Sequence, residues 1–492
     1  MAKRTDIKNP SPYGAWSVAD NMSRRAFLGG ALAAGAALTA GWPSAARAQE
    51  APVKGASSAA AQYKLDLGGY AGPELTSKPI TLKVMRQEFL ANVNEVLAQA
   101  YKQFSEAYPN ITIEEERVPY GDLQKKMQVY VSSGDAPDIM MGRTDFTEAY
   151  HVGKLALPLQ EYFLDEYLKD VLDNQLKAAS SHGNLYGAPW ETYFTAMYFN
   201  KDIFAKAGVE TPPEVTDVTA GWDFEKFLGT MEELTTKLRA QGDKDTWAVS
   251  AATHGNGGPG ANYTQVESLW VRSQGDPNAE KGSSLHNTFL GVSEDGLKAT
   301  GYLDTPEAIQ GMKNYQRLFS SKLAPPTAMP NQFVGGTGAI HFTGLNLARR
   351  LFTTTPNFQW GMSPLPRGRS VFNCNSSDTP IVWSKTAYPA EAAALVAFLC
   401  NDANRINFYN TWGSMPVRKS LIAKLPDFSS KQLFQLAAST AAIGQGAPRT
   451  VGWFDYFNAI NPIVRDIALG ADPDATLKEA ARKIDGLLRK YG

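Results

Sequence analysis

Residues 80–141 alternate between short apolar strands and amphipathic helices, and this alternation restricts the possible folds more than any other feature of the chain. Ile80, Leu82 and Val84 alternate with polar residues, as in a half-buried strand. The elements that follow are a helix, a strand, a helix and a strand, over residues 93–104, 111–118, 121–131 and 138–141. Strands separated by helices in this order predict a parallel sheet with right-handed crossovers, and therefore an α/β fold.

Polar residues follow the first and the third of these strands. Ligands of such sheets bind beyond the carboxyl ends of the strands, so we expect Arg86, Arg143 and Asp145 to share one rim. The two arginines leave open a ligand with a carboxylate, sulfonate or phosphate, because a guanidinium binds such groups through two hydrogen bonds. Structural salt bridges explain both arginines equally well.

The segment Gly187 to Asn200 combines a turn with aromatic and acidic residues. Its Gly-x-Pro turn lets the backbone change direction, and Trp190, Glu191 and Tyr193 follow at once. Aromatic faces cover the apolar side of a sugar ring, while a carboxylate accepts hydrogen bonds from the sugar hydroxyls. The segment therefore predicts a polyol-binding cleft beside a hinge. An ordinary buried strand is the alternative, because aromatic residues are common in strands.

A glycine-rich loop at residues 255–260 matches the pattern G-x-G-x-x-G. A dinucleotide site is disfavoured there, because Pro259 removes an amide that the motif would use and the loop lies in the middle of the chain. We expect instead a loop at the edge of the cleft, with Trp270 on the following helix as a stacking face.

The first 48 residues have the features of an export signal. A twin-arginine pattern, Ser-Arg-Arg-Ala-Phe-Leu, precedes an apolar stretch too short to span a bilayer and an Ala-Arg-Ala cleavage site, at residues 23–28, 29–41 and 46–48. We expect residues 1–48 to direct the folded protein to the periplasm by the twin-arginine route; a transmembrane anchor is the alternative. Residues 49–78, rich in Ala, Gly and Ser, are predicted to be a linker.

Composition excludes several classes of protein. The chain has 492 residues, enough for two domains, and its net charge of −1 gives no basic excess for nucleic-acid binding. The five histidines lack the spacing of a metal motif, so neither a metal nor a cofactor is predicted. Cys374 and Cys400 leave a disulfide open, although a buried free thiol is the commoner state for Cys400 at the end of an apolar helix.

Eight short motifs occur in a characteristic order along the chain. They occupy residues 101–110, 132–139, 153–159, 185–189, 198–208, 338–340, 364–366 and 413–418. Examples are Ser-Ser-Gly-Asp-Ala-Pro-Asp-Ile from Ser132 and Gly-Ser-Met-Pro-Val-Arg from Gly413. In their order and spacing they resemble the extracellular solute-binding proteins of bacterial ABC transporters, in the carbohydrate-binding group. The resemblance covers nearly all of residues 79–492.

This resemblance implies two α/β lobes, each a sheet flanked by helices, joined by a hinge that the chain crosses three times, near Ala188, Asn373 and Gly413. One lobe would combine residues 79–187 with 374–412, and the other 188–373 with 413–492. Such proteins act as monomers, close on a ligand without catalysis and deliver it to a membrane permease. Closure shifts a population, so the affinity includes the free energy of the hinge.

Site residues carry over only where positions match. Asp145 resembles the family's frequent acceptor of sugar hydroxyls, and Glu191 matches a polar position past the first hinge. Asn346 stands where the family often has Trp, and small polar residues replace the glycines common at the second hinge. The predicted ligand-binding set is Arg86, Arg143, Asp145, Trp190, Glu191, Tyr193, Trp270, Gly344, Asn346, Asn375, Ser377 and Trp412.

The second class considered is an exported glycoside hydrolase or lyase, with Asp145 and Glu191 as its carboxylate pair. That chemistry needs a fixed separation between the carboxyl groups and one raised pKa, and the sequence indicates neither. A binding protein for a metal, polyamine or peptide would keep the fold and change the ligand. The sequence therefore favours a binding protein for a sugar or sugar derivative.

Overall fold

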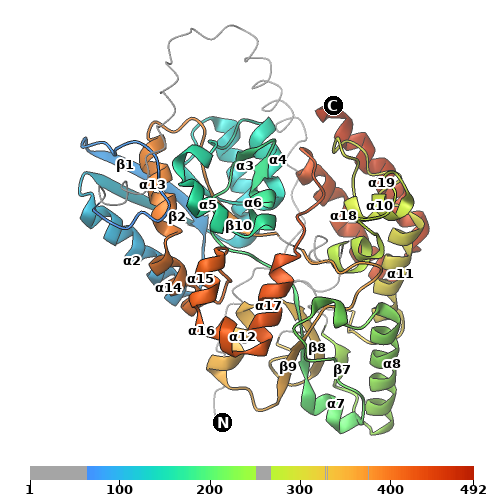
Figure 1. Cartoon of the computed structure of the whole chain (residues 1–492). Helices are drawn as coiled ribbons and strands as arrows, with labels where there is room; N and C mark the ends of the chain where they lie inside the picture. The colour runs from blue at the N-terminus through green and yellow to red at the C-terminus, as the bar shows by residue number, and fades with distance from the viewer. Residues whose placement is uncertain (1–63, 251–266, 327–328, 330, 375) are drawn as a thin grey trace, which may run out of the picture.

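The computed structural model describes residues 64–250, 267–326, 329, 331–374 and 376–492. In that part of the chain there are two separate four-stranded sheets, each flanked by helices (Figure 1). The predicted α/β fold is therefore confirmed. The predicted signal sequence and the glycine-rich loop lie outside the described residues.

The first sheet contains the predicted β-α-β-α-β unit. Its strand order is β10-β3-β1-β2, with β1 parallel to both β2 and β3 and β10 antiparallel to β3. The strands are β1 (Ile80–Gln87), β2 (Ile111–Val118), β3 (Ile139–Arg143) and β10 (Asp378–Val382), and the crossover helices are α2 (Ala91–Ala107) and α3 (Leu123–Ser133). Apolar and polar residues alternate over residues 80–84 of β1 because successive side chains point to opposite faces of the sheet, so every second residue faces the core.

The second sheet is mixed, with the order β7-β8-β6-β9. Strand β6 pairs antiparallel with β8 and β9, while β7 runs parallel to β8. The strands are β6 (Ala196–Asn200), β7 (Trp247–Val249), β8 (Gly338–Thr343) and β9 (Trp360–Ser363). Its main helices are α7 (Lys201–Ala207), α8 (Phe224–Ala240), α11 (Pro306–Ser320), α18 (Trp453–Ala468) and α19 (Pro473–Leu488).

Each sheet has its own hydrophobic core. The first core adds α13 (Pro389–Leu399), which is apolar all round because it is buried on every side, and part of α14 (Asp402–Trp412). The second core joins β6, β7 and β8 to the five helices just named. A third cluster lies under α12 (Asn346–Thr354), α16 (Pro426–Ser430) and α17 (Gln432–Ala442). We call the bodies around the two sheets the first and the second lobe.

The chain passes between the lobes at segments that are hydrogen-bonded to one another. The backbone N–H of Thr192 donates to the carbonyl of Met415 at 3.0 Å. The side-chain amide of Asn373 accepts from the N–H of Thr195 at 2.9 Å and donates to its carbonyl at 2.6 Å. These bonded segments include Asn373 and adjoin the other two predicted hinge positions; the hinge positions and the lobe boundaries remain predictions.

The predicted linker is shorter than expected. Leu67 and Tyr70 are buried in the first core, and Tyr70 pairs with Phe163. The Asn401 side chain donates to the carbonyl of Asp66 at 2.8 Å. The linker was predicted from the high content of Ala, Gly and Ser, which gave no weight to these two large side chains. Their burial fixes the segment to the first lobe.

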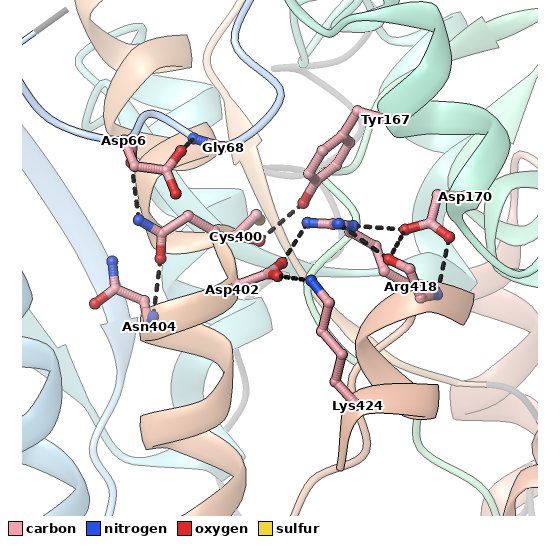
Figure 2. Close-up of polar contacts among 11 residues, drawn as sticks. Asp66, Gly68, Tyr167, Asp170, Cys400, Asp402, Asn404, Arg418 and Lys424 are labelled. Carbon is pink, nitrogen blue, oxygen red and sulfur yellow. Dashed lines mark hydrogen bonds and ion pairs between the residues drawn. The ribbon is translucent and has the colours of Figure 1, made fainter. Parts of the chain in front are cut away.

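An ion-pair network holds the segment around Arg418 against the first lobe, and the neighbouring Val417 is buried in the first core. Arg418 donates to Asp170 at 2.9 Å and to Asp402 at 2.5 Å, and Lys424 contacts Asp402 (Figure 2). The guanidinium of Arg418 also lies 4.6 Å from the ring centre of Tyr167. This network joins the segment from Arg418 to Lys424 to α5 (Asp165–Asp170) and to the start of α14.

The two cysteines are both buried and are not joined in a disulfide. Cys400 caps α13 inside the first core, as favoured from the sequence. None of the described helices is sufficiently long and apolar to cross a membrane.

Candidate functional site

A polar site lies where the first sheet meets the chain's passages between the lobes. Arg143 ends β3, Asp145 follows in the turn Thr144–Phe146, and Asp378 opens β10 opposite Arg143. The passage after Gly187 runs alongside, because the N–H of Ala188 donates to the carbonyl of Pro380 at 2.9 Å. The carboxyl end of β3 therefore carries this site, as expected for a sheet of this kind.

Asp145 is held by two donors and keeps one oxygen unused. Its Oδ2 accepts from Arg143 at 2.9 Å and from the Ser376 hydroxyl at 2.6 Å. Its side chain is 3% exposed, and Oδ1 has no hydrogen-bond partner among the described residues. Since an unsatisfied buried acceptor costs about 1–3 kcal/mol, this oxygen is suited to accept from a ligand.

Glu191 has a similar free acceptor on the first passage. It is 7% exposed, and its Oε2 lacks a partner in the described part of the chain. Burial raises the pKa of Glu191, while the positive charge of Arg405 opposes that rise. The carboxyl group is thus buried beside one cation and retains an oxygen for a donor.

Asp378 interacts electrostatically with both of these carboxyl groups. Burial, followed by repulsion from Glu191, raises the pKa of Asp378 to about 7, although the charge of Arg143 acts in the opposite direction. Near neutral pH this carboxyl group therefore exchanges between an acceptor-only and a donating form.

Ser377 connects the first lobe to the first passage. Its N–H donates to the Thr144 hydroxyl at 3.1 Å, and its own hydroxyl accepts from the N–H of Tyr193 at 3.0 Å. These bonds hold the backbone of Tyr193 against the first lobe, so Ser377 positions Tyr193. The side chain of Ser377 is buried.

The second lobe brings Gly344 and Asn346 to the ring of Tyr193. A Cβ atom at Gly344 would approach Cε2 of Tyr193 to 2.7 Å, so only glycine permits this contact. Asn346 begins α12, and a Cβ atom at Gly413 would lie 3.0 Å from its Cα. Trp412, the last residue of α14, packs edge-on against Phe89 at 5.4 Å and stays partly exposed.

The prediction that Trp270 offers a stacking face is wrong. The residue is 0% exposed in the second core, where its ring stacks on Phe224 at 4.7 Å and contacts Phe227 and Tyr315 edge-on. The segment Glu267–Val271 turns this ring inward because the burial of so large an apolar surface is strongly favourable.

The prediction for Trp190 also needs correction. Its ring is 2% exposed, with the Arg405 guanidinium 4.2 Å from its centre and Phe408 against its edge at 5.1 Å. Both neighbours belong to α14, so Trp190 packs in the first core and has no open face for a ligand.

Arg86 is a structural residue, as the salt-bridge interpretation held. It is buried and donates to Glu115 at 2.6 Å, to the Gln87 carbonyl at 2.8 Å and to Asn94 at 2.7 Å. These contacts lie inside the first lobe and remove the guanidinium from the rim. Asn375 lies outside the described residues.

Reasoning from the sequence missed Tyr120, Asp378 and Arg405. Tyr120 follows β2, is 39% exposed, and has the Arg143 guanidinium 5.9 Å from its ring centre. The carboxyl-end rule, applied to the second strand as well as to the first and third, would have found it. No local pattern marks Arg405 or Asp378, because each meets Glu191 only through the fold.

The polar site lies at the carboxyl end of β3, beside the passages that join the two lobes, which is a position suited to binding a ligand. A family comparison agrees. The chain belongs to the bacterial extracellular solute-binding protein family, whose model matches residues 99–435. The predicted class, a solute-binding protein and not an enzyme, is confirmed.

Individual relatives are similar over most of the chain. A binding protein of Brucella abortus (strain 2308) is 27% identical over 417 residues, which cover 82% of this chain and 92% of that protein. The sugar-binding protein MalE of Xanthomonas citri has a similar structure, with a TM-score of 0.65, 17% identity, and coverage of 84% and 98%. The cyclic alpha-maltosyl-1,6-maltose binding protein of Arthrobacter globiformis also has a similar structure. Its TM-score is 0.65 and its sequence identity is 18%, over 84% of this chain and 100% of that protein. These solved structures confirm the two-lobed fold.

Proposed function

We propose that this chain is the periplasmic sugar-binding component of an ABC transporter, exported by the twin-arginine route. It captures a sugar or sugar derivative between its lobes and delivers it to a membrane permease. The names of solved structural neighbours, which include sugar-binding and cyclic maltosyl-maltose-binding proteins, support this ligand class. The motif at residues 23–28 supports the route, and a monomer is expected from the family resemblance.

The observation that carries the proposal is the pair of unused acceptors, Oδ1 of Asp145 and Oε2 of Glu191. Each is buried, each belongs to a carboxylate, and Asp378 interacts with both groups. Sugar hydroxyls are neutral donors that satisfy such acceptors without introducing a charge. The same hydroxyls accept as well as donate, so they suit both protonation states of Asp378.

Aromatic side chains from several segments supply the apolar part of the site. Tyr120 comes from the first lobe, Tyr193 from the first passage, and Trp412 from the end of α14. A sugar ring held between such faces buries its C–H side while its hydroxyls meet the carboxylates. Arg143, Gly344, Asn346 and Ser377 complete the proposed site.

The charges of the site favour a neutral ligand over an anionic one. Asp145 is already paired with Arg143, and Glu115 is paired with Arg86. Both predicted rim arginines therefore already have carboxylate partners, so neither would compensate an anionic group placed beside Glu191 and Asp378. We therefore place neutral sugars ahead of sugar acids.

The test is thermal unfolding of the exported protein with a panel of maltooligosaccharides, other neutral sugars, sugar acids and polyols. A ligand at one hundred times its Kd adds about 2.7 kcal/mol to the free energy of unfolding, a shift of a few degrees for a protein of this size. The expected result is a shift with a neutral sugar that is recovered unchanged, and its loss in Asp145→Asn. Consumption of the sugar, or a full shift in Asp145→Asn, contradicts the proposal.

A control variant tests whether removing any surface carboxylate has the same effect as removing that of Asp145. Asp474→Asn removes a carboxylate from the exposed pair with Lys478 on α19, far along the chain from the site. It should keep the whole ligand-induced shift. A loss in both variants would point to a general effect of charge and would not support a role for Asp145.

A further inference from the structure

Two histidines and a glutamate gather beside the turn that carries Asp145, although they are distant in sequence from one another. Glu148 and His151 lie on α4 (Thr147–Val152), and His182 lies in the turn between β4 (Ser180–Ser181) and β5 (Asn184–Leu185). One ligand atom from each side chain lies within 4.8 Å of the others. We propose that Glu148, His151 and His182 bind a divalent late transition-metal ion, of which Zn²⁺ is the representative.

The local chain places these ligands for a structural reason. Residues three apart on a helix share a face, so Glu148 and His151 project together from α4. His182 has a φ of 47°, a left-handed conformation that turns the hairpin tip, and its ring lies 4.8 Å from that of His151. The other side of His151 stacks on Tyr186 at 5.3 Å, which fixes the plane of its imidazole.

Ser181 determines which nitrogen of a neutral His151 ring carries the proton. The Ser181 hydroxyl donates its single proton to Oε2 of Glu148 at 2.7 Å. Its contact with Nδ1 of His151, at 2.9 Å, therefore requires Nδ1 to be the donor. The neutral ring then has its lone pair on Nε2, the form that binds a metal, with the other nitrogen oriented by a hydrogen bond.

Metal binding requires the three ligand atoms, now within 4.8 Å of one another, to move closer together. Four ligands at about 2.0–2.1 Å from a tetrahedral zinc ion stand about 3.4 Å from one another. Nε2 of His182 lies 3.9 Å from Oε2 of Glu148, and the His182 side chain is 72% exposed, so it can rotate inward without disturbing the core. Water would supply the fourth position.

The donor set selects the metal. Two imidazoles and one carboxylate suit zinc, copper, nickel or iron, whereas calcium and magnesium prefer six or more oxygens. The partner of Glu148 strengthens this choice. Nη1 of Arg449 lies 3.2 Å from Oε1 of Glu148, so the carboxylate is already neutralised and attracts hard cations weakly.

Arg449 also defines a distinctive test. It donates to the backbone carbonyls of Lys177 and Ser180 and belongs to the loop after α17, next to Ala447 of the second core. Its positive charge opposes a cation at Glu148. Replacing Arg449 with Met should therefore tighten metal binding, a change opposite in direction to that expected when a ligand is removed.

The experiment is calorimetric titration of the tag-free full-length protein with Zn²⁺. We expect one ion per chain, at least tenfold weaker binding in His182→Asn and His151→Gln, and several-fold tighter binding in Arg449→Met. Asn is chosen at position 182 because it tolerates positive φ. His286→Gln alters a histidine on α10 (Ser284–Leu290) and should leave the affinity unchanged.

Two further readouts keep the result interpretable. Thermal unfolding without metal should show that His182→Asn is as stable as the parent, so a loss of affinity reflects the ligand. Co²⁺, added in place of Zn²⁺, should give the visible absorption typical of a four-coordinate ion. This absorption should be lost in His182→Asn. Absence of Zn²⁺ binding, or equal affinity in the parent and both histidine variants, would overturn the proposal. The proposed sugar site contains none of the three metal ligands, so the result of the metal titration does not depend on the result of the sugar-binding test.

Discussion

The guanidinium of Arg405 lies 4.2 Å from the centre of the Trp190 ring, and Arg405 is also the cation that faces Glu191. One buried arginine thus joins the core of the first lobe to a carboxylate of the proposed site. The relationship makes Trp190 a structural residue, whose loss acts through stability.

Trp190→Ala should destabilise the protein by about 3–5 kcal/mol, the range for large aromatic side chains removed from a core. Urea unfolding measures this loss, and the affinity of the remaining folded protein should change little. Unchanged stability together with a large loss of affinity would return Trp190 to direct ligand contact.

Tyr120→Ala should have the opposite profile. Its ring is partly exposed at the rim, so we expect affinity for a sugar to fall by about 1–3 kcal/mol with little change in stability. Titration calorimetry with the sugar that the thermal-unfolding panel identifies measures the effect. Leu469→Ala, at an exposed apolar residue after α18, is the control and should bind normally. Equal affinity in both variants would exclude Tyr120 from the site.

Asp378 should make the protein less stable as the pH rises. Its pKa is about 7 in the folded state against an ordinary value of 3.8, so between these values the folded chain binds more protons than the unfolded chain. The free energy of unfolding therefore falls as the pH rises toward and through 7. Asp378→Asn should remove this contribution, and thermal unfolding at pH 5 and pH 8 measures the difference. An unaltered pH dependence in Asp378→Asn would contradict the assignment.

Arg418→Met should cost about 1–3 kcal/mol, because Arg418 donates to two carboxylates and covers the ring of Tyr167. Arg465→Met is the matched control, since among the described residues Arg465 forms an ion pair with the exposed Asp466 alone, at 3.5 Å, and should contribute about 0–1 kcal/mol. Urea unfolding of both variants checks the contrast. Equal costs would mean that the network around Arg418 contributes no more than a surface pair.

The sequence was informative wherever a local pattern determines a local structure. Alternation at Ile80, Leu82 and Val84 predicted β1, and the carboxyl-end rule brought Arg143 and Asp145 to the site. Aromatic residues were harder to place, because a tryptophan such as Trp270 has the same local signature whether it faces a cleft or a core. Its environment is set by Phe224 and Tyr315, which lie far along the chain.

The remaining parts of the site depend on contacts between distant segments. The hydroxyl of Ser377 receives the N–H of Tyr193 from a segment 184 residues away, and no spacing rule anticipates that contact. Glu148 and His182 meet only because the β4–β5 hairpin folds back onto α4. A metal motif sought at fixed spacings therefore fails to include them.

The double hydrogen bond between Asn373 and Thr195 has a mechanical consequence. Two passages joined edge to edge can bend together, but they cannot slide past each other without breaking both bonds. The bond from Thr192 to Met415 adds a third passage to the same unit. We therefore expect the three passages to move as one unit, so that any relative motion of the lobes is mainly a rotation about the axis they share.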